Sequence, residues 1–255
     1  MGPMASEQGI DPGNHPMSSQ SLESKRMIIT IDGPAGTGKS SVAQMLAARL
    51  GLDSLDTGAM YRGIALVTIE RGIDPSAPEQ VARIAADCEL DFDWTQSPPA
   101  LLLNGSMPGE RIREEDVDRR VSIVAGNPEV RTILVEAQRA IASRHPRLVT
   151  EGRDQGSVVF PDAEFRFYLD ASPEVRADRR VRQSRESGLP ADFDDVLEAI
   201  KARDHRDETR KDGPLAVPEG ATRIDTSTLG LETVVDRLES MVLDRPDEVE
   251  GASDP

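Results

Sequence analysis

The chain has few residues of the kinds that build covalent or metal-stabilised sites. Its 255 residues include one cysteine, Cys88, so no disulfide can form within the chain, and this usage suits a reducing compartment. Cys88 lies in an apolar-patterned stretch, which favours packing over nucleophilic chemistry. The three histidines, His15, His145 and His205, are scattered, which argues against a histidine metal site.

Aromatic residues, basic charge and long apolar runs are also scarce. Aromatic residues make up only 3% of the chain, so aliphatic side chains must build the core. No run is long and apolar enough to cross a bilayer, and residues 1–26 lack the apolar centre of a signal peptide. We therefore expect a cytoplasmic protein with no membrane partner. The formal net charge of −16 argues against a nucleic-acid partner. Exposed charges are screened beyond about 8 Å in physiological salt, so local arginines can still form an anion site.

Length and composition predict one α/β domain with a small insertion. Residues 1–26 are rich in serine, glycine and proline, and residues 244–255 are acidic. We expect both ends to be disordered, around a folded domain that spans residues 27–243. We also expect this domain to be a monomer.

Residues 27–41, M-I-I-T-I-D-G-P-A-G-T-G-K-S-S, carry the strongest local pattern. They predict a buried strand, a glycine turn and the start of a helix. Gly33 to Ser40 fit G-x-x-x-x-G-K-[ST], the phosphate-binding loop. A chance glycine turn is the alternative. An apolar helical face over residues 42–50 follows the loop directly, and this context favours phosphate binding.

Each part of this loop has a physical role in binding a polyphosphate. Glycines let the backbone wrap closely around the anion, and the amides at the helix start face it. Lys39 can reach the β- and γ-phosphates, and the Ser40 hydroxyl can ligate Mg²⁺. The expected donor-nucleotide site comprises Gly33, Pro34, Ala35, Gly36, Thr37, Gly38, Lys39, Ser40 and Ser41.

The rest of the chain alternates predicted strands and helices, which indicates a central parallel sheet flanked by helices. Strands are expected at residues 147–150, 165–169 and 222–225. Ser76 to Glu79 fit a capping box that opens a short helix.

The pattern changes between about residues 84 and 125. Residues 90–94 alternate apolar and acidic side chains, residues 101–103 form a second apolar run, and Asn104-Gly105 predicts a hairpin turn. We interpret this segment as an inserted small antiparallel β subdomain. The pattern alone suits a structural insertion and a substrate-binding unit equally well.

Two short segments are candidates for a second substrate site. L-D-T-G-A-M-Y-R, at residues 55–62, brings Thr57, Tyr61 and Arg62 just after the first helix, although an ordinary loop and helix start fits equally well. Arg153 and Asp154 follow a predicted strand, at the end where open α/β sheets bind ligands. A surface ion pair between these two neighbours is the alternative.

An arginine-rich region near the C-terminus suggests a lid. Five arginines lie between residues 176 and 185, and Gly188-Leu189-Pro190 breaks the helix that carries them. Three more arginines follow at residues 203–210. Such a helix is usually a solvated face. In an acidic chain with a phosphate loop, arginines on both arms of a helical break favour a short helical lid at about residues 174–192.

Four segments together resemble the bacterial cytidylate kinases, a family of nucleoside-monophosphate (NMP) kinases with a P-loop. They are G-P-A-G-T-G-K-S-S, L-D-T-G-A-M-Y-R, E-G-R-D-Q-G-S-V-V-F-P-D-A and I-K-A-R-D-H-R-D-E-T-R, and the resemblance covers residues 27–243. It implies a P-loop kinase fold with an inserted NMP-binding subdomain and a short lid. It also implies transfer of the ATP γ-phosphoryl group to CMP or dCMP, with Mg²⁺ as cofactor.

The resemblance assigns roles to particular residues. Lys39, Arg153 and Arg179 would be catalytic, with Arg179 reaching the transferring phosphate from the lid beside Arg176. Separate groups would hold the acceptor phosphate, the cytosine and the sugar. The implied CMP-binding residues are Thr57, Tyr61, Arg62, Ser122, Arg131, Arg153, Asp154, Arg203, Asp207 and Arg210.

The chain departs from the family pattern at two positions. Glu151 stands where aspartate is usual, and Gln155 stands where an apolar residue is common. A regulatory GTPase is disfavoured because N-K-x-D and D-x-x-G are absent. A shikimate kinase is disfavoured by the Tyr-Arg and Gly-Arg-Asp motifs. Another NMP kinase remains the serious alternative.

Overall fold

The computed structural model describes residues 26–186 and 188–244. The proposed extension at residues 1–26 and tail at 244–255 therefore lie almost wholly outside the described residues. None of the described helices is long and apolar enough to cross a membrane. The elements, in chain order, are β1 (Met27–Asp32), α2 (Lys39–Leu50), β2 (Asp53–Asp56), α3 (Thr57–Glu70), α4 (Pro78–Asp87), β3 (Leu90–Asp93), β4 (Ala100–Leu103), a 3₁₀ turn (Gly109–Arg113), α5 (Glu115–Val124), α6 (Pro128–Arg144), β5 (Arg147–Gly152), a π-helical turn (Gln155–Val159), β6 (Phe165–Asp170), α7 (Pro173–Glu186), α8 (Phe193–Thr209), β7 (Thr222–Asp225) and α9 (Leu231–Leu243).

A parallel five-stranded sheet forms the centre of the protein, as the sequence predicts. Its strand order is β2-β5-β1-β6-β7, and every neighbouring pair is parallel. The carboxyl ends of all five strands therefore lie at one edge. Asp32 at the end of β1 pairs in register with Gly152 of β5 and with Tyr168 of β6.

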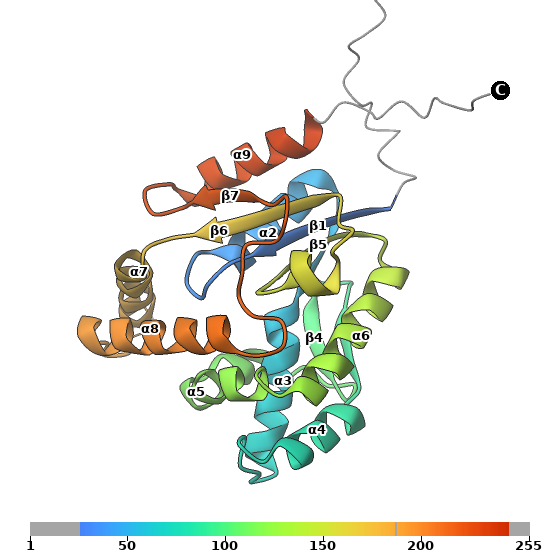
Figure 1. Cartoon of the computed structure of the whole chain (residues 1–255), viewed down its shortest axis with the longest axis vertical. Helices are drawn as coiled ribbons and strands as arrows, with labels where there is room; N and C mark the ends of the chain where they lie inside the picture. Colours follow the sequence, from blue (N-terminus) through green and yellow to red (C-terminus); the bar gives the residue numbers. More distant parts are fainter. Residues whose placement is uncertain (1–25, 187, 245–255) are drawn as a thin grey trace, which may run out of the picture.

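Two hydrophobic clusters cover the two faces of this sheet. Ile28 belongs to the cluster that includes α3, α4, α5 and α6, whereas Ile29 and Ile31 belong to the cluster that includes α2 and α9. This alternation follows from the period-two geometry of a strand. Figure 1 shows α9 on one side of the sheet, and α3, α4 and α6 on the other.

The segment predicted as an insert contains the antiparallel pair β3 and β4. Asn104-Gly105 forms a hairpin turn, as the sequence predicts. The turn follows β4 and is closed by an antiparallel bridge between Leu103 and Ser106, whereas residues 94–99 connect β3 to β4. Asn104 and Gly105 both have positive φ, so the local turn chemistry was correct. A turn signal marks the turn, but it does not say which strands pair.

The start of α4 differs from the prediction. Pro78 begins the helix, but the N-cap residue is Ala77 and no side chain caps it. The backbone amide of Ser76 instead donates to Asp74 Oδ1 at 2.9 Å. An Asx turn before the helix therefore takes the place of the expected capping box.

Candidate active site

A cavity of about 330 Å³ opens at the carboxyl edge of the sheet, between the loop after β1 and helices α3, α5, α7 and α8. Its wall contains sixteen of the residues proposed from the sequence. They are Ala35, Gly36, Gly38, Lys39, Ser40, Ser41, Thr57, Tyr61, Arg62, Ser122, Arg131, Arg153, Asp154, Arg203, Asp207 and Arg210. Gly33, Pro34, Thr37 and Arg179 do not line this cavity.

The loop after β1 has the backbone that its glycines permit. Gly33 has a φ of 146°, and a Cβ there would lie 2.0 Å from the carbonyl oxygen of Leu169. Only glycine fits at that position. Lys39 begins α2, and its Nζ donates to the carbonyl oxygen of Pro34 at 2.9 Å. Burial, together with the nearby Arg153, lowers the pKa of Lys39. A bound phosphate would provide this ammonium group with an anionic partner.

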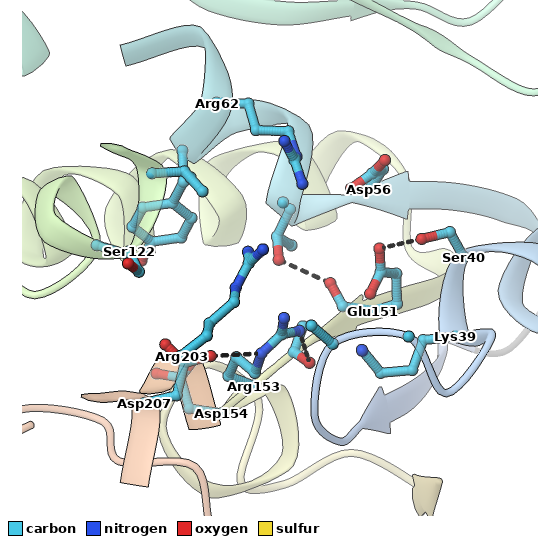
Figure 2. Close-up of a pocket in the computed structure, with 18 of the residues that line it drawn as sticks. Lys39, Ser40, Asp56, Arg62, Ser122, Glu151, Arg153, Asp154, Arg203 and Asp207 are labelled. Atoms are coloured by element: carbon cyan, nitrogen blue, oxygen red, sulfur yellow. Dashed lines mark hydrogen bonds and ion pairs between the residues drawn. The ribbon is translucent and has the colours of Figure 1, made fainter. Parts of the chain in front are cut away.

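Ser40 and Glu151 join the loop to the end of β5. The Ser40 hydroxyl donates to Glu151 Oε1 at 2.7 Å (Figure 2). Burial and the nearby Asp56 carboxylate raise the pKa of Glu151. The longer side chain of Glu151 thus contacts the hydroxyl that the loop motif assigns to Mg²⁺. Within residues 26–186 and 188–244, no three His, Cys, Asp or Glu side chains are grouped so that they could hold a metal ion.

The neighbours Arg153 and Asp154 do not form a pair with each other. Arg153 Nε donates to Asp207 Oδ2 at 3.0 Å, and Asp154 accepts from Arg131 Nη2. Asp154 and Arg131 are 3% and 4% exposed, so the surface ion-pair interpretation is wrong. Side chains from two helices, Arg131 of α6 and Asp207 of α8, therefore bind the Gly-Arg-Asp turn.

Two arginines in the cavity wall have unused donors. Arg203 Nε and Arg210 Nη2 are buried and have no hydrogen-bond partner. Arg210 Nη2 lies 3.9 Å from Asp154 Oδ1, too far for a hydrogen bond. Burial lowers the pKa of both arginines, and nearby arginines add to the effect. Buried donors of this kind fit an anionic ligand.

Tyr61 and Ser122 line the part of the cavity next to Arg131. Arg131 Nη1 donates to the Tyr61 hydroxyl at 3.4 Å, and Arg206 Nε donates to Ser122 Oγ at 3.1 Å. Burial raises the pKa of Tyr61 to about 12, so its hydroxyl stays neutral. This region therefore presents a neutral phenol and hydroxyl beside a buried arginine–carboxylate pair.

The second departure, Gln155, is fully accommodated by the core. Its Oε1 accepts from Thr150 Oγ1 at 2.9 Å, and its Nε2 donates to Gln138 Oε1 at 3.2 Å. The backbone amides of Gln155 and Gly156 donate to the Asp32 carboxylate at 2.7 and 2.8 Å. These bonds fix the turn that presents Arg153 and Asp154.

Two arginines of α7 contact the protein instead of the cavity. Arg176 makes a bidentate bond to Asp204 of α8 and also donates to the carbonyl oxygens of Ala35 and Ala171. Arg179 donates to both oxygens of Thr226, in the loop after β7. In this conformation Arg180, which was not proposed as a site residue, faces the cavity from α7.

Sequence reasoning missed other residues of the cavity wall. Asp56 precedes the predicted Thr57, and its carboxylate accepts from the Ala59 amide, a capping signal that could have been noticed. Gly58 and Gly152 lie inside motifs that the sequence singles out, and Arg180 belongs to the arginine-rich helix, but nothing in the local pattern distinguishes the other wall residues. The remaining wall residues are Gly58, Arg113, Val121, Ala125, Gly152, Arg180 and Gln183, besides Glu151.

Comparison with known proteins identifies the family. The cytidylate kinase family matches residues 29–243. A cytidylate kinase of Rhodococcus opacus (strain B4) is 43% identical over 228 residues, covering 88% of this chain and 98% of the relative. One of Corynebacterium efficiens is 46% identical over 212 residues, covering 83% and 92%. Among solved structures, a shikimate kinase from Bacteroides thetaiotaomicron has a TM-score of 0.46 and 12% identity, over 85% of this chain and 98% of its own, which is too distant to bear on function. The chain belongs to the cytidylate kinase family.

Proposed function

We propose that this chain transfers the γ-phosphoryl group of ATP to CMP or dCMP, giving ADP and the cytidine diphosphate. One observation carries the proposal: a single cavity joins the phosphate loop to a set of buried arginines and carboxylates. The loop suits a donor polyphosphate, and the opposite wall suits a nucleoside monophosphate. The family assignment supports this choice of substrates.

Lys39 and the loop amides hold the donor phosphates in this proposal. Lys39 exchanges its bond to the Pro34 carbonyl for the β- and γ-phosphate oxygens. Mg²⁺ fits beside Ser40, because the Ser40 hydroxyl and the Glu151 carboxylate supply hard oxygen atoms 2.7 Å apart. When bound, Mg²⁺ neutralises charge on the phosphate oxygens. Glu151 orients the Ser40 hydroxyl for that contact.

Arg62, Arg153 and Arg210 hold the acceptor phosphate. All three line the cavity, and the buried Nη2 of Arg210 is an unused donor. Asp207 keeps the Arg153 guanidinium in place through their 3.0 Å bond. The acceptor is already an anion near neutral pH, so the reaction needs no strong general base. Catalysis then rests on positioning and charge neutralisation.

Arg131, Asp154 and Ser122 read the cytosine edge, and Tyr61 lines the base pocket. Cytosine has a carbonyl and a ring nitrogen that accept hydrogen bonds and an amine that donates. A guanidinium beside a carboxylate matches that pattern. Uracil would present a carbonyl where the amine stands, next to the Asp154 carboxylate, which disfavours UMP.

The remaining assignments concern the sugar and the lid. Arg203 and Asp207 bind the ribose or deoxyribose. Residues around 174–192 act as a lid, and Arg179 must leave Thr226 to reach the transferring phosphate. We also propose residues 84–125 as the NMP-binding subdomain, because Ser122 and Val121 of α5 lie in the cavity wall.

A coupled assay with ATP and Mg²⁺ across CMP, dCMP, UMP, AMP and dTMP tests the proposal. We expect the highest kcat/KM with CMP or dCMP. A preference for UMP or AMP would overturn the substrate assignment. Absence of transfer to all five would overturn the enzyme class.

A further inference from the structure

Asp118 in α5 is surrounded by three arginines from three other helices. Its Oδ1 accepts from Arg62 Nη2 of α3 at 2.7 Å and from Arg203 Nη1 of α8 at 3.1 Å. Its Oδ2 accepts from Arg180 Nη2 of α7 at 3.0 Å. Three guanidinium groups around one small anion resemble the coordination of a phosphate more than an ordinary ion pair.

These three arginines belong to the cavity wall, whereas Asp118 does not. Arg62, Arg180 and Arg203 all line the cavity, and Asp118 is not among the lining residues. In Figure 2 the Arg62 and Arg203 side chains extend toward each other from different elements. Their common partner is the Asp118 carboxylate. Arg203 keeps its buried Nε free for a further acceptor.

The electrostatic environment keeps Asp118 ionised. Burial alone would raise its pKa, but Arg203, Arg62 and Arg180 outweigh that effect and lower the pKa to about 2. A full negative charge therefore faces the arginines at neutral pH. Without it, Arg203 would stand close to Arg153 and Arg62 with less opposing charge.

We propose that Asp118 is a built-in counter-ion that competes with nucleotide phosphate for Arg62 and Arg180, while it also pairs with the proposed sugar contact Arg203, and so sets the affinity of the cavity for phosphate. This inference rests on the proposed function. The carboxylate carries one negative charge and a phosphate monoester carries nearly two, so the phosphate prevails when it binds. Asp118 keeps the arginines ordered in the absence of nucleotide, at the cost of weaker phosphate binding.

The opposite role is a latch that closes α5 onto α7 and α8 around the substrate. The two roles predict opposite effects of Asp118→Asn. A counter-ion that competes with phosphate makes the variant bind CMP and inorganic phosphate more tightly, with Kd lowered about threefold to tenfold. A latch makes the variant bind both more weakly.

Titration calorimetry with CMP and with inorganic phosphate separates these outcomes. Asp116→Asn is the matched control, because Asp116 lies on the same helix and its two oxygens pair with Arg111 at 2.7 Å instead of with the cavity arginines. It makes the same change in net charge. We expect tighter binding by Asp118→Asn than by Asp116→Asn, and a larger rise in melting temperature when phosphate is added.

Equal Kd values for the two variants, or weaker binding by Asp118→Asn, would overturn the inference. The asparagine keeps a carbonyl oxygen for the arginines, and Asp118→Ser provides a second uncharged variant should it not fold. Wild-type protein that binds phosphate but transfers nothing to CMP would refute the proposed function while leaving the test of Asp118 intact.

Discussion

At the scale of single residues, Asp154 is where base discrimination is expected. We predict that Asp154→Asn lowers the ratio of kcat/KM for CMP over UMP about tenfold, because the amide loses the charge that faces the cytosine amine and can donate to a uracil carbonyl. Steady-state kinetics with both nucleotides measure this ratio. The CMP/dCMP ratio is the internal control, since the proposed sugar contacts come from α8. An unchanged CMP/UMP ratio would remove Asp154 from base recognition.

Arg153 tests whether the site needs a guanidinium or only a positive charge. Its Nε contacts Asp207, whose side chain is 7% exposed, so removal of the charge would strand a buried carboxylate. Arg153→Lys keeps the charge but loses the planar fork. We expect kcat to fall about 100-fold, with little change in melting temperature. A normal kcat with a lowered melting temperature would assign Arg153 to a structural ion pair.

Asp32 gives the fold a pH dependence with a defined sign. Burial raises its pKa to about 6, although two backbone amides donate to it. Between about pH 4 and 6 the folded state thus holds a proton that the unfolded state releases, so the free energy of unfolding falls as pH rises. We expect the stability of the wild type relative to Asp32→Asn to drop by about 2 kcal/mol from pH 4 to pH 7. Urea unfolding at each pH measures it, and a constant difference would contradict the raised pKa.

At the scale of elements, Arg176 joins α7, α8 and the phosphate loop. Its guanidinium donates hydrogen bonds to the Asp204 carboxylate and to the carbonyl oxygens of Ala35 and Ala171. We predict that Arg176→Lys lowers the free energy of unfolding by about 2 kcal/mol, because an ammonium cannot make the bidentate bond. Urea unfolding measures this loss.

The same helix provides a control for that prediction. Arg182 pairs with Asp178 on the exposed face of α7, at 2.8 Å. Arg182→Lys should change stability by less than about 0.5 kcal/mol. Similar losses in the two variants would mean that Arg176 does not hold α7 and α8 to the loop after β1.

Local patterns in the sequence were sufficient to predict the helices and strands, but they did not predict which side chains pair across the fold. The glycines and Lys39 predicted the phosphate loop because strand, turn and helix are contiguous. The pairing of Arg153 with Asp207 spans 54 residues, and that of Arg131 with Asp154 spans 23. Neither spacing is a helical or strand period, so only the folded chain brings these groups together. The family resemblance indicated which residues belong to the site, but it did not indicate which of them pair with each other.

At the scale of the whole molecule, the sheet separates α3, α5 and α6, which form part of the cavity wall, from the hydrophobic cluster of α2 and α9. Leu134 of α6 and Leu238 of α9 are both fully buried, in different hydrophobic clusters. The parallel sheet and its two faces followed from strand and helix alternation. Which face carries the cavity residues of α3, α5 and α6 did not, because that depends on how these helices pack together.

This separation predicts that equal losses of stability have unequal effects on activity. Leu134→Ala and Leu238→Ala should each lower the free energy of unfolding by about 2–5 kcal/mol through the cavity they leave. Leu134 lies one turn after Arg131, so its cavity lets the arginine that meets Asp154 shift, and KM for CMP should rise several-fold. Leu238 lies across the sheet, so KM should stay unchanged. Urea unfolding and steady-state kinetics on both variants provide the comparison. Equal changes in KM would mean that the sheet transmits core strain to the site, and that the two faces are not mechanically independent.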